Sequence, residues 1–156
     1  MLPGHPLAKL LGVPTSVRRA DLDDLPVLMI LAAEYCQADG HVFDPQRVRD
    51  GFEPLLTGDS VGTAWMIDET DGYVVVTWGW SVEIGGLEVV LDEIYVRTSG
   101  TGKGSVALDV IEQDCRQRGV RRIFLETERP NQRARRLYAR HGYTEDDSIW
   151  MSKELQ

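Results

Sequence analysis

The chain has 156 residues, of which 42% are hydrophobic and 27% are charged, and its formal net charge is −8. This length predicts one domain with its own core, and the composition excludes an intrinsically disordered chain. The negative balance argues against nucleic acid or an anionic membrane as the main partner, because both require a basic face.

Cysteine usage and hydropathy exclude further classes. Cys36 and Cys115 form no CxxC pair, which excludes a zinc ribbon and disfavours a disulfide framework. No apolar run approaches the ~20 residues of a membrane span, and the first residues lack a basic region before an apolar stretch. We therefore expect a cytoplasmic protein with reduced thiols and no metal.

Residues 1–14 contain three prolines and two glycines, which predicts a loose leader before one domain over residues 15–156. A first strand is expected over 15–20. Apolar residues then recur at helical spacing from Leu25 to Ala32, and Gly40 predicts the end of that helix.

A second helix is expected from Asp44-Pro45, a capping pair, to about residue 58. Strands follow over 63–68, 73–83 and 87–96, separated by Asp-Gly and Gly-Gly turn signals. Short hairpins of this kind predict antiparallel pairing.

The last third of the chain alternates between the two kinds of element. We expect a helix up to Gly119, a strand over 122–128, a helix from Pro130 to about Gly142 and a final strand over 148–155. The strand–helix–strand unit over 87–128 predicts a right-handed parallel crossover. The fold class is therefore mixed α/β, with helices on both faces of a mostly antiparallel sheet.

The segment Ser99–Ser105, SGTGKGS, follows a strand and opens a helix. Glycine lets the backbone approach a ligand closely, and a helix N-terminus presents free N–H groups to an anion such as phosphate. A Walker A loop is excluded because Gly104, not Ser or Thr, follows Lys103. A Rossmann fingerprint is excluded because the glycines run GxGxG.

The same segment resembles the acyl-CoA loop of the GNAT N-acetyltransferases, Q/R-x-x-G-x-G/A. The motif fits with Arg97 at its first position, and a second register with Ser99 there fits the following helix. The segment from Asn131 to Tyr143 also resembles the family pattern N-x-x-A-x-x-x-Y-x-x-x-G-F/Y. The resemblance covers essentially the whole domain and implies the GNAT fold, with about six to seven strands and four helices.

The resemblance implies acetyl transfer from acetyl-CoA to an amine by direct attack in a ternary complex. Glu93, on the central strand, is then the candidate base, although a water chain could serve instead. Tyr138 is the candidate acid for the leaving thiolate. Strand alternation places Asp92 on the face opposite Glu93.

Family members bind pantetheine along the central strand and the diphosphate on the glycine loop. The residues implied to bind acetyl-CoA are Ile94, Tyr95, Val96, Gly100, Thr101, Gly102, Lys103, Gly104, Ser105, Asn131, Ala134 and Tyr138.

In this family the first two helices and the strand hairpins form the acceptor cleft. Carboxylates and aromatic rings there suit a polycationic amine by ion pairing and cation–π contact. We expect an aminoglycoside or a polyamine, with a peptide or amino-acid acceptor and a non-catalytic acyl-CoA-binding module as alternatives. A homodimer is possible, as in many relatives. The candidate acceptor-binding residues are Glu34, Tyr35, Asp39, Trp80, Glu83 and Asp92.

Overall fold

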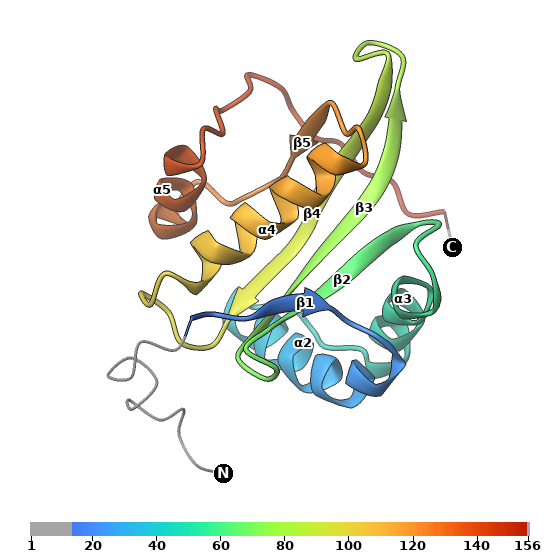
Figure 1. Ribbon diagram of the computed structural model, residues 1–156, viewed down its shortest axis with the longest axis vertical. Helices are drawn as coiled ribbons and strands as arrows, with labels where there is room; N and C mark the ends of the chain where they lie inside the picture. The colour runs from blue at the N-terminus through green and yellow to red at the C-terminus, as the bar shows by residue number, and fades with distance from the viewer. Residues whose placement is uncertain (1–13, 156) are drawn as a thin grey trace. The chain divides into compact units, whose positions relative to one another are not determined.

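The structure, a computed structural model, describes residues 14–155. These residues fall into two compact units, of which the first ends at Glu126 and the second begins at Thr127. The expected leader lies, except for Pro14, outside the described residues. The first unit contains the sheet and three α-helices, and the second contains helix α5, Gln132–Arg140 (Figure 1).

The sheet has strands in the order β1-β2-β3-β4-β5. The first three neighbouring pairs are antiparallel and β4 pairs with β5 in parallel, which confirms the mixed, mostly antiparallel topology. The parallel pair is joined by helix α4. The strands are β1 (Val17–Arg19), β2 (Gly62–Ile67), β3 (Gly72–Ser81), β4 (Gly86–Val96) and β5 (Arg122–Phe124).

The helices of the first unit begin and end where local chemistry predicts. Helix α2, Leu25–Asp39, follows the short 3-10 helix η1, Leu22–Asp24, and ends at Gly40 with φ +72°. The Asp44 carboxylate caps α3, Pro45–Thr57, by accepting two backbone N–H bonds. Helix α4 spans Lys103–Gln117. Four α-helices in the described residues match the expected number.

Helices cover both faces of the sheet, as predicted. One core joins the apolar stripes of α2 and α3 to alternate residues of β2 and β3, including Met66 and Tyr73. The intervening residues, such as Val74 and Val76, are also buried and belong to the opposite face. Helix α4 crosses in front of β4 in Figure 1 and buries Leu108 and other apolar residues.

A β-bulge interrupts the pairing of β3 with β4. Val75 lies opposite Glu93 and Val76 lies opposite Leu91, so Asp92 has no partner residue on β3. Paired residues share a face of an antiparallel sheet. The bulge therefore places Glu93 on the face covered by α2 and α3 and Leu91 on the other, whereas residues two apart in a regular strand share a face. Simple alternation no longer fixes the direction of Asp92.

Two expectations about strands are wrong. The strand expected over 122–128 ends at Phe124, and residues 148–155 form no strand. The described residues thus contain five strands rather than six or seven. Alternation in the C-terminal segment suggested a strand, but a strand also requires a hydrogen-bonding neighbour, and none pairs with this segment in the described residues.

A substitution at Gly62 tests the close packing between β2 and β3. A Cβ added there would collide with the Val76 carbonyl oxygen. We expect Gly62→Ala to lower the free energy of unfolding by about 1–3 kcal/mol, the usual cost of overpacking. In the matched control, Gly51→Ala within α3, the new methyl meets nothing within 4 Å, and we expect a gain of roughly 0.5–1 kcal/mol from helix propensity. Urea unfolding of both variants measures this difference, and equal stabilities would contradict the packing.

Candidate active site

The central strand β4 has an open backbone edge in its C-terminal half. Its parallel pairing with β5 covers Glu88, Val89 and Val90 and stops there. In the described residues no strand pairs with residues 91–96 on this side. Backbone N–H and C=O groups of an open edge can bind an extended ligand in the manner of an added strand.

The open edge leads directly into the glycine loop. Gly100 and Gly102 have φ of +75° and +83°, a left-handed conformation that glycine adopts without strain. Gly104 already lies within α4 and has no such φ, so the backbone fits the motif register that begins at Arg97. No side chain caps α4. Its first amides are therefore placed to bind an anion, with the helix dipole adding to the attraction.

The Arg97 side chain points toward α2 rather than standing free. Its guanidinium donates to both carboxylate oxygens of Glu34, at 2.7 and 2.6 Å, and to the Thr70 carbonyl oxygen at 2.8 Å. The Tyr95 hydroxyl also donates to Glu34, at 3.3 Å. These hydrogen bonds, Arg97 first, lower the pKa of Glu34 despite its partial burial. The predicted acceptor-binding residue Glu34 is thus already paired.

Lys103, the first residue of α4, also has partners. Its Nζ lies 2.8 Å from a carboxylate oxygen of Asp68 and 2.8 Å from one of Asp71. Burial alone would lower the pKa of Lys103, but these two hydrogen bonds outweigh it and raise the pKa. Asp68 and Asp71 belong to the turn between β2 and β3.

Glu93 is half-buried on the face covered by α2 and α3. Burial raises the pKa of its carboxyl group, and the charge of Asp92 raises it further. The Tyr73 hydroxyl opposes this shift by donating to Glu93 Oε2 at 2.7 Å, because a donated bond stabilises the ionised form. A carboxylate with a raised pKa is a stronger base than an ordinary surface glutamate.

Aromatic rings and one thiol lie on the same side of the sheet as this carboxylate. The ring of Tyr95 lies 6.1 Å from that of Tyr35 and 6.3 Å from that of Tyr73, between centroids. Burial raises the pKa of the Cys36 thiol, and so do the negative charges of Glu93 and Asp39. Predicted residues of α2 and β4 are thereby brought close together.

Other predicted acceptor residues lie elsewhere. Trp80 is 74% exposed near the tip of the β3–β4 hairpin, and Glu83 is exposed in the turn that follows. Trp80 lies seven positions after Tyr73 along β3, roughly 23 Å at the rise of a strand. Asp39 ends α2, where its carboxylate lies 3.6 Å from His41 Nδ1. The candidate acceptor residues therefore do not form one cluster.

The second unit contains the other predicted residues. The Asn131 side chain accepts a hydrogen bond from the Ala134 amide at 3.1 Å and thereby caps α5. Tyr138 is buried, its ring packs against Tyr143 with centroids 5.8 Å apart, and burial raises its pKa to about 12. Its phenol is therefore protonated near neutral pH and can donate a proton.

Tyr73 was missed by reasoning from the sequence. It reads as one more apolar residue of a strand, since nothing in the pattern shows that its hydroxyl meets a carboxylate twenty residues later. The Asp-Gly turn at Asp71 was noted only as a hairpin signal. Only the register between β3 and β4 could have identified Tyr73 as a neighbour of Glu93.

Within the described residues, no helix is long and apolar enough to cross a membrane. The same residues contain no group of three or more histidine, cysteine, aspartate or glutamate side chains arranged to hold a metal ion.

Replacing Tyr73 with phenylalanine tests the assigned electrostatics of Glu93. Tyr73→Phe keeps the buried ring but removes the hydrogen bond that lowers the pKa of Glu93, so that pKa should rise further. Carboxyl carbon NMR titration of the Glu93 side chain measures the change. Tyr95→Phe is the matched control because its hydroxyl bonds Glu34 instead. An unchanged Glu93 pKa in Tyr73→Phe would contradict the assigned hydrogen bond.

Solved structures share this fold. An integron cassette protein, HFX_CASS3, from the mobile metagenome of Cole Harbour Salt Marsh is 33% identical, with 90% of each chain covered and a TM-score of 0.80. A ribosomal-protein-alanine N-acetyltransferase from Brucella melitensis biovar Abortus 2308 is 23% identical, covering 90% of this chain and all of its own, with a TM-score of 0.74. A predicted acetyltransferase with acetyl-CoA from Clostridium acetobutylicum is 16% identical over 91% and 97% of the two chains, TM-score 0.74.

A search of curated protein sequences found no match. The sequence model described as the Acetyltransferase (GNAT) family matches residues 28–143, most of the chain. That range includes β4 with its open edge, the glycine loop and α5. The protein is an N-acetyltransferase that belongs to the GNAT family.

Proposed function

We propose that the protein transfers the acetyl group of acetyl-CoA to a primary amine of a small cationic acceptor by direct attack. The observation that carries this proposal is that three features follow one another along the chain, from β4 into the glycine loop and α4. Glu93, with its raised pKa, lies within the open edge of β4, and that edge runs into a loop with two left-handed glycines and an uncapped helix N-terminus.

The residues present fit acetyl-CoA. Backbone groups from Ile94 to Val96 would bind the pantetheine arm, and amides from Gly100 to Ser105 would bind the diphosphate. In the second unit, Asn131 and Ala134 at the start of α5 would add contacts to the pantetheine arm. Bound in this way, acetyl-CoA would supply an activated acyl group and a thiolate leaving group.

Glu93 would act as the base. A free alkylamine has a pKa near ~10 and is mostly protonated at neutral pH, so its nitrogen must lose a proton before attack. The amine nitrogen would then form a bond to the thioester carbonyl carbon as the C–S bond breaks. Burial raises the pKa of Glu93 and so favours its taking up the proton.

Tyr138 would act as the acid. The departing thiolate requires a proton, and the phenol, whose pKa burial raises to about 12, still carries its proton at neutral pH and would supply it. The position of Tyr138 in the segment from Asn131 to Tyr143 supports this role. The amine loses two protons in all. One goes to Glu93 before attack, and the second, lost once the C–N bond has formed, would return to Tyr138 after this phenol has given its proton to sulfur.

The acceptor would be an aminoglycoside antibiotic or a polyamine. With an aminoglycoside as acceptor, the protein would be an antibiotic-resistance enzyme. The net charge of −8 supports a polycationic acceptor. The partly exposed rings of Tyr35 and Tyr95 support cation–π contact with it, and Asp92 adds a carboxylate next to the base.

A thiol-release assay with acetyl-CoA tests the function, using aminoglycosides, polyamines, amino acids and peptides as acceptors. We expect saturable turnover with a polycationic amine. Glu93→Gln and Tyr138→Phe should each lower kcat by about 10²–10⁴, the usual contribution of a positioned acid or base, while the Kd of acetyl-CoA changes little.

The other outcomes contradict separate parts of the proposal. Turnover with peptides or amino acids alone would keep the enzyme and discard the cationic acceptor. No turnover, with acetyl-CoA still raising the melting temperature, would favour a binding module. Unchanged kcat in either variant would remove that residue from the mechanism.

A further inference from the structure

The turn between β2 and β3 holds the glycine loop at both of its ends. The Arg97 amide donates to the Asp71 carbonyl oxygen at 2.7 Å. The Thr98 hydroxyl donates to Asp71 Oδ1 at 2.7 Å, and Lys103 Nζ donates to Asp71 Oδ2 at 2.8 Å. One residue thus contacts the chain just before the glycines and just after them.

These contacts are partly shielded from water. The side chains of Asp71 and Lys103 are 15% and 21% exposed, and Asp68 adds a second carboxylate 2.8 Å from the lysine. Ion pairs with this much burial are less screened than surface pairs. Lys103 is therefore paired with carboxylates of the turn and forms a tie, a link between the start of α4 and that turn.

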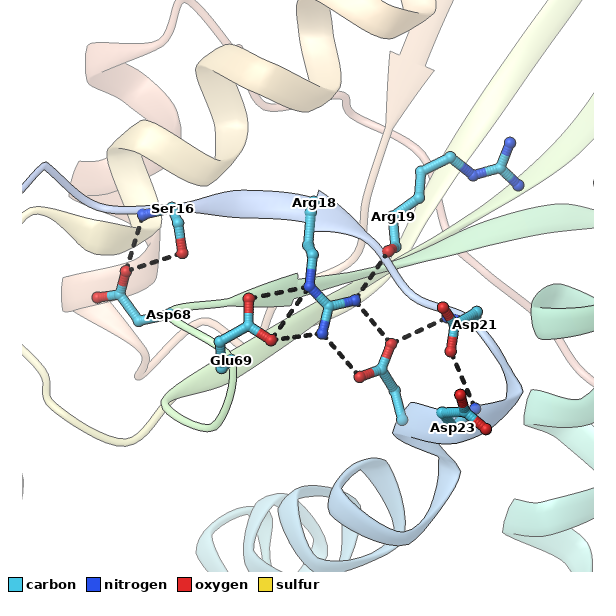
Figure 2. Close-up of polar contacts among 8 residues, drawn as sticks. Ser16, Arg18, Arg19, Asp21, Asp23, Asp68 and Glu69 are labelled. Carbon is cyan, nitrogen blue, oxygen red and sulfur yellow. Dashed lines mark hydrogen bonds and ion pairs between the residues drawn. The ribbon is translucent and has the colours of Figure 1, made fainter.

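The turn itself is fixed from its other side. Figure 2 shows Asp68 accepting from the Ser16 backbone amide, at 2.8 Å, and Glu69 accepting from the Arg18 guanidinium. The Asp68 amide in return donates to the Ser16 carbonyl oxygen at 2.9 Å. Arg18 also bonds both carboxylate oxygens of Asp24, at 2.8 Å each. The turn is thereby anchored to β1 and to η1.

The backbone of the turn requires such anchoring. Asp68 and Glu69 have φ of +45° and +59°, a left-handed conformation that is costly for residues with a Cβ. The glycine loop has little to restrict its backbone, because Gly100 and Gly102 have no Cβ and an added Cβ would meet nothing within 4 Å. The shape of the loop therefore depends on ties outside it.

The charges near the loop would otherwise oppose its function. Asp68, Asp71 and Lys103 together carry one net negative charge beside a loop suited to an anion. Carboxylates at such a place weaken anion binding through Coulomb repulsion. Their contribution to binding would then be to hold the loop in its binding shape.

We propose that Asp71 is a positioning residue that holds the glycine loop in the conformation that binds the diphosphate of acetyl-CoA, with Lys103 as its tie. The proposal rests on the proposed function. Asp71 itself does not touch the ligand, and it acts through Thr98 and Lys103. A loop held in advance loses less conformational freedom on binding, which increases affinity.

Replacing Asp71 distinguishes a positioning role from simple electrostatics, because the two predict changes of opposite sign in the Kd of acetyl-CoA. Asp71→Ala removes a negative charge, so electrostatics alone predicts tighter binding of acetyl-CoA. Positioning predicts a Kd raised at least about tenfold, since two hydrogen bonds with the carboxylate are lost. Titration calorimetry with acetyl-CoA measures Kd. Asp50→Asn, which removes a negative charge from an exposed position on α3 and touches neither the turn nor the loop, is the control for charge and should leave Kd nearly unchanged.

A double-mutant cycle with Lys103→Met tests the tie. Lys103→Met should weaken binding in the wild type and weaken it less in Asp71→Ala, because the two changes share the Lys103–Asp71 contact while the Lys103–Asp68 contact remains in Asp71→Ala. Equal losses in both backgrounds would mean that Lys103 contacts the phosphates independently, and would overturn the proposal. In the thiol-release assay, Asp71→Ala should raise the KM for acetyl-CoA while kcat and the KM for the acceptor stay constant.

The remaining outcomes are equally decisive. An unchanged or lower Kd in Asp71→Ala overturns the positioning role. If Asp71→Ala does not fold, Thr98→Val removes the same hydrogen bond from the loop side without changing charge, and it too must weaken binding. A wild-type protein that does not bind acetyl-CoA would overturn the proposed function itself, and with it this role.

Discussion

The bulge in β4 at Asp92, next to the point where pairing with β5 ends, is the constraint on which the site depends. Val90 is the last residue of β4 that pairs with β5, and the bulge lies two residues later. The bulge places Glu93 on the face covered by α2 and α3, where Tyr73 donates a hydrogen bond to it, and the end of pairing leaves a free backbone edge. Without either feature, β4 would be an ordinary central strand with no place for a ligand.

Several charged groups around the site are each balanced by a hydrogen bond or an ion pair within the chain. Burial raises the pKa of Glu93, whereas Tyr73 holds that increase within limits by stabilising the ionised form. The carboxylates of Asp68, Asp71 and Glu34 each have a cationic partner from the glycine loop or its borders. The overall negative charge is therefore arranged locally rather than spread evenly, and the paired carboxylates are less available to an acceptor than the sequence suggested.

The sequence predicted most of the fold because the determining signals are local. Asp44 with Pro45 begins α3, and Gly40 ends α2 in the left-handed conformation that glycine favours. The errors arose where an element depends on a distant neighbour. Residues 148–155 alternate like a strand but have no pairing partner in the described part of the chain, and only the register across β3 and β4 shows that Asp92 forms a bulge.

The candidate site was predictable in its backbone and not in its side-chain partners. Gly100 and Gly102 identified the loop, and both have the left-handed φ that glycine adopts without strain. The partners of Glu34 and Lys103 lie 63 and 32 to 35 residues away in the chain, at Arg97 and at Asp71 and Asp68. No sequence pattern shows such contacts, so two residues assigned to ligands already have partners within the chain.

Hydrogen exchange of backbone amides with and without acetyl-CoA tests the central claim most directly. We expect acetyl-CoA to slow exchange in peptides covering residues 91–96 and 99–105, because these amides would bind the pantetheine arm and the diphosphate. Peptides from β2, which is paired on both sides, should not change. Binding of acetyl-CoA without protection of these two segments would contradict the account.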